Sequence, residues 1–247
     1  MSIRIGHARS TEDGKAINGK AGDQTGKEVM ISNYYNHSKG WDCYIECTDS
    51  KLADKASKYM EEICANDNVG YDQNERLTMY NAIKKNDNKV KGIGKCETDC
   101  SALVSACYIF AGLGTKLNPS CTTRNIRQAL LNTGKFKAYS SKEYTASDTL
   151  AKRGGIYLKE GSHVVMALED GKGVNKAPNK PSGTSYYPKC KSTYTSLVDA
   201  LASVGVDISK DNRAKIYVKN FKGDAYKGTA KQNTDMLELL KKGKLKK

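Results

Sequence analysis

The alternation of apolar and polar positions predicts mixed secondary structure over residues 1–174. Apolar residues at every second position predict a half-buried strand whose inner face carries Trp41, Cys43, Ile45 and Cys47. Similar patterns predict strands over residues 155–159 and 163–169, and helical spacing predicts helices over residues 52–66, 74–86 and 101–111. The pattern therefore predicts an α+β domain, with helices early in the chain and an antiparallel sheet late.

A proline-rich segment divides this domain from a smaller one. Three of the four prolines fall within residues 175–188, which show no hydrophobic period and are rich in turn formers. We expect a linker there, followed by a small helical domain over residues 189–247. Its three helices are predicted over residues 195–204, 209–219 and 229–242, with Ser209 and Thr229 as caps.

Composition and charge restrict the class of protein. A hydrophobic fraction of 38% and a charged fraction of 28% are typical of a soluble globular protein, and no apolar run is long enough for membrane insertion. The first seven residues lack the apolar stretch of a secretory signal peptide, so we expect synthesis in the cytoplasm.

The net charge of +14 predicts attraction to a polyanion: nucleic acid, anionic lipid or the teichoic acids of Gram-positive walls. Residues 189–247 hold 14 Lys and Arg against 6 Asp and Glu, a net charge of +8.

The eight cysteines are expected to be free thiols, because the chain is long enough to form a proper core. A zinc site is the competing hypothesis, since Cys43 with Cys47 and Cys96 with Cys100 could each supply two thiolates. Strand alternation explains the first pair more simply, and no histidine is near either pair in sequence. We therefore expect neither a metal nor a cofactor.

Cys100 is the candidate nucleophile. Thr98 or Asp99 can cap the helix that Cys100 opens, and the amide groups of a helix N-terminus stabilise a thiolate. Of the three histidines, His7 and His37 lie in polar segments, whereas His163 begins an apolar strand. His163 is therefore the predicted general base. The alternative is that Cys100 and His163 are ordinary buried residues.

Several segments carry a family resemblance. Asp99-Cys-Ser-Ala-Leu-Val104, Lys152-Arg-Gly-Gly-Ile-Tyr-Leu158 and Gly161-Ser-His-Val-Val-Met166 resemble motifs of NlpC/P60 cysteine peptidases and the related CHAP amidases. Gly22-Asp-Gln-Thr-Gly-Lys-Glu28 and Gly70-Tyr-Asp-Gln-Asn-Glu-Arg76 resemble peptidoglycan hydrolases of phages and prophages of Clostridia-like bacteria. Residues 196–207 and 228–233 are similar to the C-terminal wall-binding module of those lysins.

This resemblance implies a papain-like catalytic domain in which Cys100 and His163 are the catalytic pair. The third catalytic residue would be Asn175 or Glu169. Oxyanion or substrate support would come from four residues near the nucleophile: Tyr71, Gln73, Asp99 and Ser101. One position departs from the pattern, because Gly155 stands where these proteins usually have Asp after Arg-Gly.

The implied function is that of an endolysin, a peptidoglycan hydrolase that cleaves an amide bond in the stem peptide or at its junction with muramic acid. It would act at the wall of Gram-positive cells after release from the host cytoplasm, and it would bind peptidoglycan and anionic wall polymers rather than nucleic acid. A host-encoded wall-remodelling hydrolase or a bacteriocin would share this chemistry. A basic protein that binds walls or nucleic acid without catalysis is the alternative from another class.

Overall fold

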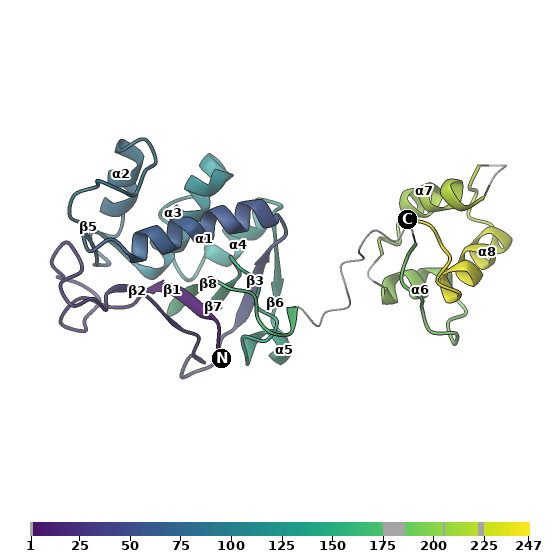
Figure 1. The fold of residues 1–247 in the computed structure, drawn as a ribbon, viewed down its shortest axis with the longest axis horizontal. Coiled ribbons are helices and arrows are strands. Elements are labelled where there is room, and N and C mark those ends of the chain that lie inside the picture. Colours follow the sequence, from purple (N-terminus) through teal and green to yellow (C-terminus); the bar gives the residue numbers. More distant parts are fainter. Residues whose placement is uncertain (1, 175–185, 205, 222–224) are drawn as a thin grey trace. The chain divides into compact units, whose positions relative to one another are not determined.

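The structure is a computed structural model that describes residues 2–174, 186–204, 206–221 and 225–247 (Figure 1). Contacts divide the chain into two compact units, Met1–Pro178 and Asn179–Lys247. Most of the expected linker, residues 175–185, lies outside the described residues. Tyr186 is already part of the second unit, where it pairs with Lys246. None of the described helices is both long enough and apolar enough to span a lipid bilayer.

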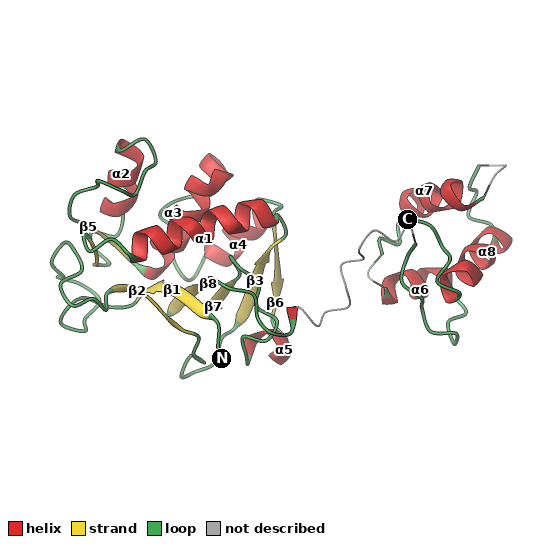
Figure 2. Cartoon of the chain, viewed as in Figure 1, coloured by secondary structure: helices red, strands yellow, loops and turns green. Residues whose placement is uncertain are grey.

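A six-stranded antiparallel sheet forms the centre of the first unit (Figure 2). Its strands, in spatial order, are Val29–Asn33 (β2), Arg4–Ala8 (β1), His163–Ala167 (β8), Ile156–Lys159 (β7), Cys43–Cys47 (β3) and Phe136–Tyr139 (β6). The sequence predicted β3, β7 and β8, but the expectation that helices come early and strands late is wrong, because β1 and β2 open the chain. Strand β1 was missed because its centre is Gly6, a poor strand former. A side chain there would collide with Met60, since a Cβ atom would lie 2.3 Å from its Cγ.

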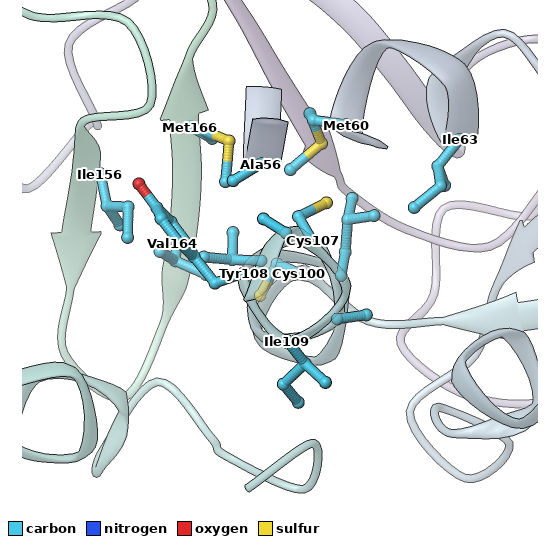
Figure 3. Close-up of a cluster of buried hydrophobic side chains, with 14 of the residues drawn as sticks. Ala56, Met60, Ile63, Cys100, Cys107, Tyr108, Ile109, Ile156, Val164 and Met166 are labelled. Carbon is cyan, nitrogen blue, oxygen red and sulfur yellow. The ribbon is translucent and has the colours of Figure 1, made fainter. Parts of the chain in front are cut away.

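Two helices, Ser50–Cys64 (α1) and Cys100–Tyr108 (α3), cover one face of this sheet (Figure 1). Helix α3 is buried along its whole length, between Met60 of α1 and Val164 and Met166 of β8 (Figure 3). The expected helix over residues 101–111 ends at Tyr108 and continues as a π-helical turn, Ile109–Leu113. The remaining elements of this unit are Val69–Tyr71 (β4), Thr78–Lys85 (α2), Cys96–Thr98 (β5), Ile126–Asn132 (α4) and Lys142–Thr145 (α5), with β4 and β5 forming a small parallel sheet.

The second face of the sheet is covered as well, which the sequence did not predict. Strand β3 was expected to expose Tyr44, yet Tyr44 is fully buried and stacks on Tyr144 of α5, with ring centroids 5.9 Å apart. Trp41 packs on this second face rather than beside Cys43 and Ile45. Both faces of β3 are therefore buried. One face joins the main hydrophobic core and the other joins a cluster rich in aromatic residues, so the alternation does not mark a solvent-exposed face.

Tyr44 also explains the missing Asp after Arg-Gly. A Cβ atom at Gly155 would lie 2.0 Å from the Tyr44 hydroxyl oxygen, so this hydroxyl occupies the space of a side chain. The same oxygen accepts a hydrogen bond from the Lys152 amide at 2.7 Å. Gly155 is thus required by the neighbouring tyrosine, and the nearby Arg153 amide donates instead to the Asp170 carboxylate at 2.8 Å.

The second unit contains three helices around a core of its own. They are Leu197–Ser203 (α6), Lys210–Asn220 (α7) and Ala230–Lys241 (α8). Ser209 and Thr229 cap α7 and α8 as predicted, and Thr229 forms a reciprocal capping box with Gln232. Ile216 supplies the buried contact of α7, whereas Val218 of the same helix is 67% exposed.

Candidate active site

Cys100 is the first residue of α3, as the sequence predicted. Asp99 adopts an extended backbone and caps the helix, because its carboxylate accepts a hydrogen bond from the Ala102 amide at 2.7 Å. Thr98, the alternative cap, ends strand β5. The parallel pairing of β4 and β5 carries the chain to this point, so Cys100 is held at a junction of strand and helix.

The Asp99 carboxylate and the Ser101 hydroxyl, predicted to support the oxyanion or substrate, are committed to structural contacts. The guanidinium of Arg76 donates to both oxygens of Asp99, at 2.6 and 3.1 Å, and to Ser101 Oγ at 2.9 Å. It also donates to the carbonyl oxygens of Ser120 and Cys121. Arg76 therefore clamps the start of α3, a role that sequence reasoning missed because the partners lie 23 to 45 residues away.

The Cys100 thiol lies against the backbone of β8. The side chain of Cys100 is part of the main core and the residue is only 5% exposed. Burial, followed by the negative charge of Asp99, raises the pKa of this thiol to about 12, while hydrogen bonds from the Val164 and Ser101 amides act in the opposite direction. The resting group is thus a protonated thiol, which corrects the expectation that the helix N-terminus makes it a thiolate.

His163 immediately precedes the amide that contacts the Cys100 sulfur. Because side chains alternate along β8, Val164 and Met166 point toward α3, whereas His163 packs on the opposite face against Trp41, with ring centroids 6.3 Å apart. Burial lowers the pKa of His163 to about 3, aided by His7, by His37 and, least, by the positive charge of Arg9. In the described residues, no hydrogen bond joins the Cys100 thiol to this imidazole, although both lie at the start of β8.

The other two histidines are not remote, contrary to the expectation from their polar sequence surroundings. His7 is buried on β1 and meets His163 edge to face, with ring centroids 5.6 Å apart. Burial lowers the pKa of His7 to about 4. His7 Nδ1 and His163 Nε2 are both buried without a hydrogen-bond partner in the structure. We call the open cavity at this end of the sheet, about 510 Å³ in volume, the histidine pocket, and it is lined by Arg9, Tyr35, Asn36, His37, Ser38, Ser162 and His163.

Tyr71 and Gln73, predicted to face the oxyanion, lie together near the nucleophile. The Gln73 side-chain amide donates to the Tyr71 hydroxyl oxygen at 3.1 Å. Burial and the nearby Cys100 raise the pKa of Tyr71 to about 12, so its hydroxyl keeps its proton. The arrangement leaves Tyr71 able to donate a hydrogen bond toward the space beside the Cys100 sulfur.

The two candidates for a third catalytic residue are not brought to His163. Glu169 lies beyond the other end of β8, roughly 20 Å along the strand direction, and Arg4 Nε donates to its carboxylate at 2.6 Å. The Arg4 side chain lowers the pKa of this carboxyl. Asn175 lies outside the described residues. The polar residue that does contact His163 is His7.

A second cluster of polar groups lies between the loop of residues 9–28 and the β4–β5 sheet. Its carboxylates tie the loop down: Glu28 accepts from the Tyr71 amide at 2.8 Å, and Asp72 accepts from the Gly19 amide at 2.9 Å. Glu97 is 4% exposed, and among the described residues its Oε1 atom has no hydrogen-bond partner. Burial and the charges of Asp72, Glu75, Glu28 and Glu12 raise the pKa of Glu97 to about 7. We call Glu28, Asp72 and Glu97 the carboxylate cluster.

The cysteines suggested as zinc ligands have other surroundings. Cys43 and Cys47 face the core from β3, and each of the eight cysteines is a free thiol. Over the described ranges, no three His, Cys, Asp or Glu side chains are grouped so that they could hold a metal ion.

The comparison with protein families supplies the identification. The family model described as "Endolysin-like domain" matches residues 5–174, more than half of the chain. The chain belongs to the endolysin-like domain family. A search of curated proteins and a search of solved structures each found no match. The endolysin-like domain contains Cys100, His163, His7 and the carboxylate cluster, whereas the second unit lies outside the matched residues.

Membership in this family supports a lytic function directed at peptidoglycan, which agrees with the sequence-based expectation of an endolysin. The mixed α/β architecture, with helices packed on an antiparallel sheet, agrees with the predicted fold class.

Proposed function

We propose that the endolysin-like domain is a papain-like cysteine hydrolase that cleaves an amide bond of peptidoglycan with Cys100 as nucleophile and His163 as general base. The observation that carries this proposal is the position of the Cys100 sulfur, at the N-terminus of α3 and against the amide that directly follows His163. A buried thiol, a neutral imidazole and an adjacent open pocket are the components that acyl transfer requires.

The resting state is a neutral pair, so the proton moves during attack. His163, with a lowered pKa, is unprotonated at neutral pH and can accept the Cys100 proton as the sulfur attacks the amide carbonyl. The imidazolium then protonates the leaving amine, and water hydrolyses the thioester. In the structure His163 packs on the face of β8 away from α3, so the mechanism requires its ring to turn about this first residue of the strand. We expect that rotation, and the bond between thiol and imidazole, when substrate binds.

Neighbouring groups supply orientation and charge stabilisation. Trp41 and His7 contact the His163 ring and fix its plane, so we assign His7 the positioning role that Glu169 and Asn175 were expected to fill. The Ser101 amide and the Tyr71 hydroxyl are the proposed donors to the oxyanion, because both lie beside the sulfur.

Mass spectrometry of fragments released from purified Gram-positive peptidoglycan tests this function and identifies the bond. We expect one class of amide to be cleaved, and Cys100→Ala to reduce the rate by at least about 10³-fold. Cys96→Ala is the matched control, since Cys96 is equally buried four residues earlier, and it should retain activity. Full hydrolysis by the Cys100 variant would rule out the cysteine mechanism.

We also propose that the second unit binds anionic wall polymers. It folds around its own core, and residues 189–247 carry a net charge of +8. Since Tyr187 donates its amide to Leu245 in this unit, the fragment to test is residues 186–247. This fragment should sediment with purified walls, and binding should weaken as salt rises. Sedimentation of residues 1–178 but not of the fragment would contradict this assignment.

A further inference from the structure

The histidine pocket has an unbalanced charge. Its lining comprises one arginine, two histidines, one tyrosine and three small polar residues, with no carboxylate from the part of the chain that the structure describes. Burial lowers the pKa of both His37 and His163, so these imidazoles are neutral at neutral pH. Arg9 is therefore the permanent charge of the pocket lining, and the pocket suits an anionic group.

Arg9 is available to bind such a group. It follows β1, and its backbone amide donates to the Glu28 carbonyl at 2.8 Å, which fixes its main chain. Its side chain is exposed, and within the described part of the chain the guanidinium forms no ion pair and no hydrogen bond. By contrast, Arg76 and Arg153 of the same unit are both paired with carboxylates.

We propose that Arg9 binds a free carboxylate of the stem peptide, so that the pocket selects substrates carrying this carboxylate over those carrying a primary amide at the same position. This inference rests on the proposed function, which places the stem peptide beside Cys100. A guanidinium presents paired N–H donors that match the two oxygens of a carboxylate. A primary amide offers one acceptor and directs an NH₂ group at a partner that can only donate. D-glutamate is the stem residue chosen to test this, because its α-carboxylate and the corresponding primary amide differ only at that group.

Substrate charge would also act on the base. Arg9 is one of the groups that lower the pKa of His163, because its positive charge opposes protonation of the imidazole. A bound carboxylate would offset that charge and raise the pKa of His163. The base would therefore become stronger when the selected substrate is present, at the step where it must accept the Cys100 proton.

Calorimetric binding of two soluble tripeptides tests the proposal: alanyl-γ-D-glutamyl-lysine, and the same peptide with the glutamate α-carboxyl amidated. The full chain carries Cys100→Ala, so that binding is measured without turnover. We expect the carboxylate peptide to bind roughly 10- to 100-fold more tightly, the range for a charge-assisted hydrogen-bonded pair. Adding Arg9→Gln should abolish this preference, and Arg9→Lys should retain part of it.

Arg124→Gln is the matched control. Its guanidinium lies near Gly161, beside the pocket but not in its lining, so the preference should be unchanged. Equal binding of the two peptides, no binding of either, a preference that survives Arg9→Gln, or an equal loss for both peptides in that variant would each overturn the proposal. Because these measurements need no hydrolysis, a preference that depends on Arg9 in a protein inactive on walls would leave this inference standing and count against the proposed function alone.

Discussion

His163 of the histidine pocket with its neighbour His7, and Glu97 of the carboxylate cluster, are buried ionisable side chains, yet burial changes their pKa values in opposite directions. It lowers the pKa of His7 and His163 to about 4 and about 3, and it raises that of Glu97 to about 7. The cause is the same in each case, because a low-dielectric environment disfavours whichever form is charged. In the histidine pocket this yields unprotonated bases, and in the carboxylate cluster it yields an acid that keeps its proton up to neutral pH.

The two groups oppose each other in their effect on stability. The histidines have folded pKa values below the unfolded value of 6.5, so the unfolded state binds more protons between about pH 4 and 6.5, and stability rises with pH there. Glu97 has a folded pKa above its unfolded value of 4.5, so the folded state binds more protons between pH 4.5 and about 7, and stability falls with pH. Each group therefore masks part of the other's effect.

The largest effect is expected on the rate of hydrolysis, when His163 of the histidine pocket is replaced. His163→Ala should reduce peptidoglycan hydrolysis by about 10²- to 10⁴-fold, because it removes the proposed general base. His37→Ala is the control, since His37 lines the same pocket but is only partly buried, and its ring contacts Ser162 Oγ and accepts a hydrogen bond from the Lys39 amide. Hydrolysis rates of purified walls, with circular dichroism as a check on folding, decide between them. Comparable losses in both variants would mean that the pocket, rather than its base, had been disrupted.

The buried carboxylate of Asp99 tests a second way of stabilising a buried ionisable group, which is an ion pair rather than the neutral form. Asp99 is paired with Arg76, and the two side chains are 11% and 17% exposed. Arg76→Met should lower the free energy of unfolding by about 3–5 kcal/mol, because it leaves a buried carboxylate without its cation. Arg127→Met, which breaks the exposed pair with Glu160, should cost less than about 1 kcal/mol. Denaturant titration of the full chain measures both; equal costs would show that the Arg76 clamp adds nothing through burial.

Glu97→Gln should separate the two pH effects. The variant keeps the shape of the side chain but cannot ionise, so at pH 8 it should be more stable than the parent by up to about 3 kcal/mol. At pH 4.5 the difference should largely vanish, and between pH 5 and 6.5 the variant should show a steeper rise of stability with pH. Thermal unfolding over this range is the measurement, with Glu143→Gln as the control, because Glu143 is exposed and is not among the charges that act on Glu97. A constant difference at all pH values would show that Glu97 does not titrate near neutrality.

The smallest effect concerns the electrostatic influence of a neighbouring carboxylate on Glu97. Of the four carboxylates whose negative charge raises the pKa of Glu97, Glu12 contributes least. Glu12→Gln should lower the midpoint of the Glu97 titration by less than about one pH unit, as befits a distant charge. Carbon-detected NMR of the Glu97 carboxyl would follow the midpoint. A rise of the midpoint would contradict the assigned direction of this interaction.

Local signals made part of this site predictable. The start of α3 depends on Asp99 and Ala102, three residues apart, so the cap and the position of Cys100 could be read from the sequence. Helices α7 and α8 of the second unit were predictable for the same reason, since Ser209 and Thr229 cap the first turns of these helices.

The histidine pocket depends on register rather than on local sequence. Pairing of Ile5 with Ala167 brings β1 beside β8 and sets His7 and His163 on one face, across more than 150 residues of chain. Nothing near His7 in the sequence indicates this partner. Thiol protonation was mispredicted for a related reason, since the helix N-terminus is visible in the sequence but the burial of Cys100 is not.

The contact between Tyr44 and Gly155 restricts the order in which these two positions can change during evolution. With Tyr44 present, any substitution at Gly155 places a Cβ atom 2.0 Å from the hydroxyl oxygen and 2.5 Å from the ring carbon that carries it. A smaller residue at position 44 would empty that space at the cost of a cavity and of the hydrogen bond to the Lys152 amide. An Asp at position 155 would therefore be tolerated only with a smaller residue at position 44, and a chain that changes position 44 first would be destabilised. The residues at positions 44 and 155 therefore constrain each other.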